Sequence, residues 1–269
     1  ILEDGYLNYK DDSLSQYTTR NNINHTLQIQ IRKVADKYNL NAGISILPQY
    51  QSVIQDYMLE HTDLSRTVYN WTPTVNLTYR WTRQEQIRFQ YRGSSSQPDM
   101  NDLIEVVDNS NPLSVTTGNA GLDPTFRNNL SLNYQKYNPV TLGSLMGGIS
   151  FNNTLRSIVR KTTLKENGGT LTRPENMEGA FSNWSASGNV NLSKSLTDQR
   201  FTFNSTSSVS YNHQEGWASV VGKESQLRTS LTTGLNENLS ASFRDDWVNV
   251  ELQGRIGYNH STNDLQPDR

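Results

Sequence analysis

The chain has 269 residues, with 24 Lys and Arg against 26 Asp and Glu, and no Cys. This composition excludes disulfide frameworks, thiolate zinc sites, cysteine nucleophiles and the basic footprint of a nucleic-acid-binding protein. Only 33% of the residues are hydrophobic and Asn, Ser and Thr together number 84, yet a 9% aromatic content argues against disorder and the scarcity of Ala favours strands over helices.

Strands are predicted along the whole chain because apolar and polar residues alternate at a period of two. Eight segments show this alternation clearly, namely 23–31, 40–46, 75–81, 87–91, 126–134, 201–211, 227–235 and 248–258, and two weaker ones lie at 144–157 and 183–192. The chain contains no convincing amphipathic helix and no apolar run long enough for a transmembrane helix. We therefore expect an all-β protein, an antiparallel up-and-down meander of about ten strands.

Charged residues are separated from apolar residues within these strands. The apolar positions of the eight clear strands carry no Asp, Glu, Lys or Arg. An Arg or Lys that faces lipid near the bilayer midplane costs about 2–4 kcal/mol, so this separation favours a transmembrane barrel over a soluble sandwich. The opposite positions are predicted to face a lumen, and they carry Arg32, Arg80, Arg88, Arg92, Arg127, Arg228, Glu251 and Arg255.

Short and long connections alternate between the predicted strands. Short ones lie near 33–38, 82–86, 138–143, 193–199 and 235–238, and long ones near 48–69, 94–125, 158–182 and 213–225. Outer-membrane barrels have short periplasmic turns and long extracellular loops, whereas a Greek-key sandwich has no reason for such regularity. A β-helix would need a short fixed repeat, which is absent. The pattern predicts part of a large transmembrane outer-membrane β-barrel.

The longest predicted connection carries the most specific motif. Its elements are Tyr91, Arg92, Gln97 and Pro98, then Asp108, Asn109, Asn111 and Pro112, and finally Gly118, Asn119, Leu122 and Pro124. In this stretch the chain resembles the outer-membrane β-barrel family of TonB-dependent receptors. Two residues depart from the family pattern, because Ala120 stands where the family usually has Pro and Thr125 where it often has Glu. These departures weaken the last element of the resemblance.

These motif residues are expected mainly to order the loop, because Asn-Pro, Gly-Asn and Asp-Pro are turn formers. Direct contact with a ligand is the alternative. A cation site at 108–111 lacks the spacing of an EF-hand, and the four His are scattered. The acidic pairs at 11–12 and 245–246 are expected to be solvated loop or turn charges. We therefore expect no enzyme, no catalytic or metal-binding residue and no cofactor.

The resemblance implies a barrel of 22 strands in the outer membrane of a Gram-negative cell, filled by an N-terminal plug. Such a receptor captures a nutrient and imports it with energy that the TonB system relays through the plug. The chain starts at Ile1 without an initiator Met and contains no recognisable plug or TonB-contacting box. We expect residues 1–269 to be a single barrel segment, whose partners are outer-membrane lipid, the remaining strands and plug, the TonB system and an unknown nutrient.

Two other functions stay open at this point. A soluble or surface-anchored all-β carbohydrate-binding module would use exposed aromatic residues such as Trp217 to stack on sugars. A hydrolase would need paired carboxylates, and nothing in the sequence favours one. If the Arg-rich positions do line a lumen, we expect its wall either to pair with acidic groups of a plug or to favour anionic solutes.

Overall fold

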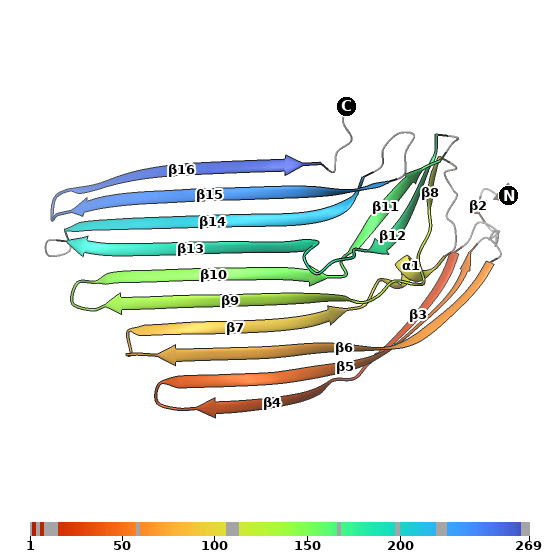
Figure 1. The fold of residues 1–269 in the computed structure, drawn as a ribbon, viewed down its shortest axis with the longest axis horizontal. Helices are drawn as coiled ribbons and strands as arrows, with labels where there is room; N and C mark the ends of the chain where they lie inside the picture. The colour runs from red at the N-terminus through yellow and green to blue at the C-terminus, as the bar shows by residue number, and fades with distance from the viewer. Residues whose placement is uncertain are drawn as a thin grey trace.

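The computed structural model describes residues 2–3, 6–7, 16–57, 60–105, 113–165, 168–196, 200–218 and 225–264. Most of them form one antiparallel sheet whose strands follow chain order (Figure 1). Its strands are β3 (Gln16–Asn24), β4 (Leu27–Val34), β5 (Tyr38–Tyr57), β6 (Glu60–Arg80), β7 (Glu85–Ser96), β9 (Thr125–Asn138), β10 (Gly143–Leu155), β13 (Asn183–Leu196), β14 (Phe201–Ala218), β15 (Gln226–Arg244) and β16 (Asn249–Asn263). The predicted all-β meander is confirmed, including both weaker strand candidates.

Strands β3 and β4 are two parts of one edge strand. Both pair with β5 in a single register, through Asn24 opposite Gln49 and Leu27 opposite Ile46. Between these pairs the His25 amide donates to the carbonyl oxygen of Pro48 at 2.9 Å. Pro48 has no N–H that could donate the second hydrogen bond, to the carbonyl oxygen of His25. The backbone ladder is therefore interrupted at this pair. The sheet therefore has ten strand positions, as the alternation predicts.

Turns and loops lie at opposite ends of the sheet. At the short-turn end, tight connections join β4 to β5, β6 to β7, β9 to β10, β13 to β14 and β15 to β16 (Figure 1). At the loop end, the long connections contain α1 (Met100–Leu103), β8 (Ser114–Thr116), β11 (Ile158–Leu164) and β12 (Thr170–Asn176). Strands β11, β12 and β8 form a small three-stranded sheet, and two further short strands are β1 (Leu2–Glu3) and β2 (Tyr6–Leu7). We call α1, β8, β11, β12 and their links the loop layer.

Several predicted connections are wrong because strands extend beyond their apolar residues. The predicted long connection 48–69 is almost entirely strand, since β5 has 20 residues and β6 has 21. The predicted short connection 235–238 lies inside β15, and the actual turn follows Arg244. Likewise β14 continues through residues 213–218, which belong to a predicted loop. Backbone hydrogen bonds continue a ladder wherever two chains stay adjacent, whether or not the side chains alternate.

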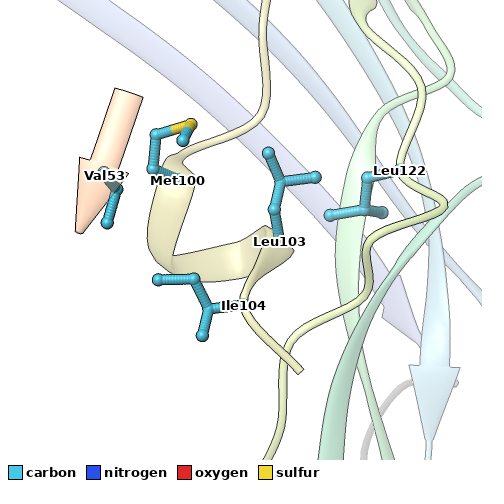
Figure 2. Close-up of a cluster of buried hydrophobic side chains, with 5 residues drawn as sticks. All are labelled: Val53, Met100, Leu103, Ile104 and Leu122. Carbon is cyan, nitrogen blue, oxygen red and sulfur yellow. The ribbon is translucent and has the colours of Figure 1, made fainter. Parts of the chain in front are cut away.

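The sheet is a single layer, so the molecule has little interior. Large apolar side chains remain exposed along it, for example Ile31 at 70%, Leu252 at 73% and Ile256 at 69%. The main buried cluster lies instead between the sheet and the loop layer and consists of Val53, Met100, Leu103, Ile104 and Leu122 (Figure 2). These exposed side chains lie on the apolar side of the sheet, which a soluble sandwich would bury against a second sheet.

Candidate functional site: the polar face and the loop layer

Cross-strand register divides the sheet into two chemically different faces. One row of directly opposed residues crosses it through Thr78, Arg88, Asn133, Gly148, Asn189, Ser208, Asn236 and Gly257. Residues an even number of positions from this row on the same strand share its face. That face, called the polar face below, carries all eight residues predicted to line a lumen, namely Arg32, Arg80, Arg88, Arg92, Arg127, Arg228, Glu251 and Arg255.

Most of the polar face is held by side-chain hydrogen bonds between neighbouring strands. Gln30 Nε2 donates to Asn41 Oδ1 at 2.6 Å, and the Ser150 and Ser187 hydroxyls are 2.7 Å apart. Arg255 Nε donates to Asn238 Oδ1 at 2.7 Å. The abundance of Asn, Ser and Thr therefore has a structural use, because polar side chains reinforce many ladder steps across this face.

The opposite, apolar face is bordered by aromatic residues at two heights. Towards the short-turn end, Phe201 packs on Phe243 with ring centroids 4.7 Å apart, and towards the loop end Trp184 packs on Tyr211 at 5.0 Å. Phe201 and Tyr211 are separated by about ten residues of β14, or roughly 33 Å of strand. A tilt of about 40° reduces this to a band about 25 Å tall, which matches the apolar band of outer-membrane barrels.

Charged residues do occur on the apolar face, outside the eight segments in which the sequence shows none. Lys33, Glu85, Lys136 and Lys194 lie near the short-turn ends of their strands, where Tyr134 Oη donates to Glu85 Oε1 at 2.7 Å and Lys136 Nζ lies 3.3 Å from Glu85 Oε2. Glu237 is different because it lies within the band and accepts a hydrogen bond from Ser205 Oγ at 2.7 Å. The prediction missed it by assigning 235–238 to a turn.

The first part of the loop motif forms a close crossing of three strands. A Cβ on Gly93 would lie 2.6 Å from Phe126 Cζ and 2.8 Å from Pro73 Cγ, so only glycine fits there. The Phe126 ring in turn stacks on Trp71 at 4.7 Å. Beside this crossing, Tyr91 Oη donates to Asn128 Oδ1 at 3.0 Å. Sequence analysis identified Tyr91 as a motif residue, but it did not identify the stacked pair Trp71 and Phe126 at the crossing next to Gly93.

Beyond this crossing, side chains take over from the backbone ladder between β6 and β7. The ladder ends at the pair Thr74 and Arg92, and Pro73 has no N–H to extend it. Further along, the Trp71 amide donates to Ser95 Oγ at 2.8 Å, and Gln97 Nε2 donates to Asn70 Oδ1 at 2.9 Å. Arg66 Nη2 donates to the buried Pro98 carbonyl at 3.1 Å. The second pair of motif residues, Gln97 and Pro98, thus anchors the start of the loop to β6.

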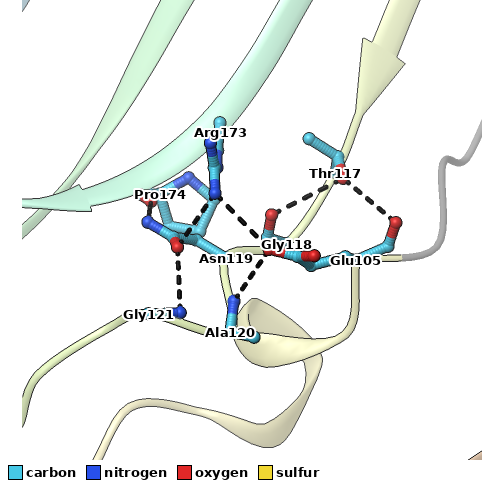
Figure 3. A network of polar contacts seen from close by, with 8 residues as sticks. All are labelled: Glu105, Thr117, Gly118, Asn119, Ala120, Gly121, Arg173 and Pro174. Atoms are coloured by element: carbon cyan, nitrogen blue, oxygen red, sulfur yellow. Dashed lines mark hydrogen bonds and ion pairs between the residues drawn. The ribbon is translucent and has the colours of Figure 1, made fainter.

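The last part of the motif joins the segment around α1 to strand β12 (Figure 3). The Gly118 amide donates to the Ile104 carbonyl at 3.1 Å, and that oxygen leaves no room for a Cβ at residue 118. Asn119 Nδ2 donates to the Pro174 carbonyl, while Asn119 Oδ1 accepts from the Gly121 amide and from Arg173 Nη2, each at 3.0 Å. A single amide side chain therefore joins its own turn to strand β12 through three hydrogen bonds.

The two departures from the family pattern have local partners. The Ala120 amide donates to Glu105 Oε1 at 3.3 Å, a bond that Pro could not make. Thr125 Oγ1 donates to the Ser96 carbonyl at 3.4 Å, where β9 begins next to the end of β7. Pro124 stands directly before β9, and Leu122 belongs to the buried cluster. Asp108, Asn109, Asn111 and Pro112 lie outside the described residues.

The loop layer packs on the polar face. Val53 of β5, which contacts α1 and its flanks, pairs with Arg20 and Leu64 on that face. Arg20 Nη2 also donates to Asn101 Oδ1 at 2.6 Å. Figure 2 shows Val53 next to Met100, with Leu103 and Ile104 on the same short segment around α1. The loop motif therefore holds part of the loop layer over one end of the polar face.

Several histidine and acidic residues that the sequence singles out have local partners where the structure describes them. Among the described residues, no three His, Asp or Glu side chains come together as metal ligands. His213 lies 3.9 Å from Glu215 and packs on Trp184. Asp245 sits in the turn after β15, where its amide donates to the Val248 carbonyl at 2.8 Å and its carboxylate is 3.6 Å from Arg200. The pair at 11–12 lies outside the described residues.

Comparison with known proteins identifies the class of this sheet. Within the part of the chain that the structure describes, no helix is both long and apolar enough to span a membrane. Residues 10–268 match the family model for the Outer membrane protein beta-barrel family. No curated protein matches the chain.

Proposed function

The chain belongs to the outer membrane protein β-barrel family and lies in the cell outer membrane, and from this premise we propose that it forms part of the wall of a TonB-dependent receptor for nutrient uptake. The observation that carries the proposal is the docking of the loop motif onto the polar face. A barrel that serves only as a wall does not need a lid over one end of that face. A receptor that captures a solute at its outer mouth does.

In this proposal the apolar face contacts membrane lipid and the polar face lines the lumen. The apolar band between the two aromatic borders supports this orientation, because lipid requires an apolar surface of that height. The short-turn end is then periplasmic, and the loop layer lies at the extracellular mouth. The soluble carbohydrate-binding alternative gains no support, because its apolar face would stand in water.

Further strands are part of the proposal because the described sheet does not close on itself. Its edge strands are β16 on one side and β3 with β4 on the other, and these edges do not pair with each other. An open edge exposes unpaired N–H and C=O groups, which lipid cannot satisfy. The complete receptor would supply the missing strands, together with a plug that contacts the TonB system.

Nutrient depletion tests the proposal even while the substrate is unidentified. Three bacterial strains are grown in the same medium, namely the parent strain, a strain that lacks this protein and a strain that lacks TonB. We expect at least one compound that the parent consumes to remain in the medium of both deletion strains. The proposal would be contradicted if consumption of these compounds required this protein but not TonB, or if it required neither.

A further inference from the structure

One region of the polar face keeps its hydrogen-bonding groups free. Gln86, Arg88, Asn133, Gln135, Asn189 and Asn191 surround a notch of about 250 Å³. None of these six side chains makes a side-chain hydrogen bond or ion pair with any described residue, in contrast to pairs elsewhere on this face such as Gln30 with Asn41 and Arg255 with Asn238. Hydrogen-bond donors without a partner are therefore concentrated at the notch. Elsewhere on the polar face, many donors bond to a side chain of the neighbouring strand.

A glycine of β10 lies next to Gly147, which lines the notch together with Tyr134 and Met146. Gly148 lies between Asn133 and Asn189 in the row of opposed residues. A Cβ at residue 148 would come within 2.8 Å of Asn189 Oδ1 and 3.0 Å of Asn133 Oδ1. The missing side chain therefore leaves room for the Oδ1 atoms of both amides next to Gly148, at the edge of the notch.

The charge around the notch is positive. Arg88 lines it, and Arg80 is its diagonal neighbour, because Arg80 pairs with Gln86 two residues before Arg88. The nearby carboxylate of Glu85 lies on the other face, where Lys136 and Tyr134 hold it. None of the described ion pairs involves Arg88 or Arg80. A ligand that enters the notch therefore meets uncompensated guanidinium charge.

We propose that this notch is a subsite for a carboxylate group. The planar guanidinium of Arg88 matches the two oxygens of a carboxylate, and the side-chain amides around it can donate to the outer lone pairs. A cation would be repelled, and a neutral sugar would leave the arginine charge without a partner. The proposal rests on the proposed function in one respect, namely that the polar face lines the lumen. The carboxylate comes either from a free solute or from an acidic side chain of the segment that fills the lumen.

Single-cysteine labelling of the full-length receptor in detergent tests this inference. The chain has no Cys, so Asn191→Cys gives one reporter at the notch once any Cys outside this chain is replaced by Ser. The rates of an anionic sulfonate and a cationic trimethylammonium methanethiosulfonate reagent are compared and normalised to their rates with mercaptoethanol. A free subsite favours the anionic reagent, and Arg88→Gln lowers the anionic-to-cationic rate ratio about fivefold or more, because one nearby charge affects both reagents oppositely.

Matched variants separate charge at the notch from general effects. Arg255→Gln removes the same charge from the same face at a laterally bonded site, and it should change the ratio less than twofold. Arg88→Lys keeps the charge and should retain most of the preference. Folding of each variant is checked by the heat-dependent shift in gel mobility that an intact barrel shows.

Two arms distinguish the sources of the carboxylate. For a free solute, succinate slows labelling while chloride at equal ionic strength does not, and Arg88→Gln abolishes the difference. For an internal carboxylate, both reagents label the parent slowly, and Arg88→Gln but not Arg255→Gln accelerates both. Three results would overturn the proposal. The first is rapid labelling of Asn191→Cys without a preference for the anionic reagent. The others are a preference that persists in Arg88→Gln and a preference that succinate does not change. Nutrient uptake that is independent of TonB would remove the proposed function and leave this labelling result unchanged.

Discussion

At the scale of single residues, the motif of the long loop depends on two glycines, which lack a Cβ, and on the side-chain amide of Asn119. Gly93 and Gly118 are required because a neighbouring ring or carbonyl occupies the space of a Cβ. Asn119 is required because its amide makes three hydrogen bonds that join its own turn to strand β12. The described contacts of these motif residues order the loop.

Replacement of Gly93 by Ala should destabilise the receptor. The new methyl group must displace Phe126 or Pro73, and overpacking of this kind costs about 1–3 kcal/mol. The measurement is the midpoint of urea unfolding of the full-length receptor in detergent. Gly254→Ala is the matched control, because no atom lies within 4 Å of a Cβ built there. Equal midpoints for the two variants would show that the crossing at Gly93 is not tightly packed.

Replacement of Asn119 by Ala should loosen the loop layer without unfolding the sheet. Three hydrogen bonds are lost, and a partner left unsatisfied costs about 1–3 kcal/mol. We expect faster hydrogen exchange in 97–105, 113–124 and 170–176, with unchanged exchange in β13 to β15. Asn236→Ala serves as control, since that side chain makes no side-chain hydrogen bond within the described residues. Unchanged exchange in the loop would contradict this role.

At the scale of elements, each long strand has two parts. Near the short-turn end its side chains alternate between the polar face and the apolar band, and towards the loop end polar ladders continue β5, β6 and β14. Strands of 18 to 21 residues are about twice the 9–11 residues needed to cross a bilayer. The outer half of these strands therefore carries the loop layer beyond the membrane.

Glu237 should weaken the band that contains it. A carboxylate that faces lipid is unfavourable by up to about 2 kcal/mol, and its hydrogen bond from Ser205 offsets only part of this. We therefore expect Glu237→Leu to raise the urea midpoint of the receptor in lipid bilayers. Glu251→Leu makes the same change on the polar face and should not raise it. A lower midpoint for Glu237→Leu would show that this carboxylate has a stabilising partner in the membrane.

At the scale of the whole molecule, a one-layer sheet can be stable only when something covers each surface and each edge. Lipid covers the apolar face of this outer-membrane protein, and the loop layer covers one end of the polar face. The two edges of the described sheet have no such cover, which is why the proposed receptor needs further strands.

Hydrogen exchange at the β16 edge tests this requirement. In the full-length protein, the amides of Asn249–Asn263 that point away from β15 should be as well protected as those that point towards it. Pairing with another strand gives this protection, because a paired amide exchanges only when the ladder opens. Rapid exchange of every second amide along β16 would show that this edge stays open in the complete protein.

The sequence by itself determined the fold class, the ten strand positions and the division into two faces. Period-two alternation is a local property, so Arg88 and Ile87 are assigned to opposite faces before any partner strand is known. The tertiary structure decided how far each ladder runs, because backbone bonds extend β5 and β6 through 48–69 without an apolar signal. It also placed Glu237 in the apolar band and brought Asn133, Gly148 and Asn189 together from three strands. Such contacts depend on register between distant segments, and no local pattern specifies that register.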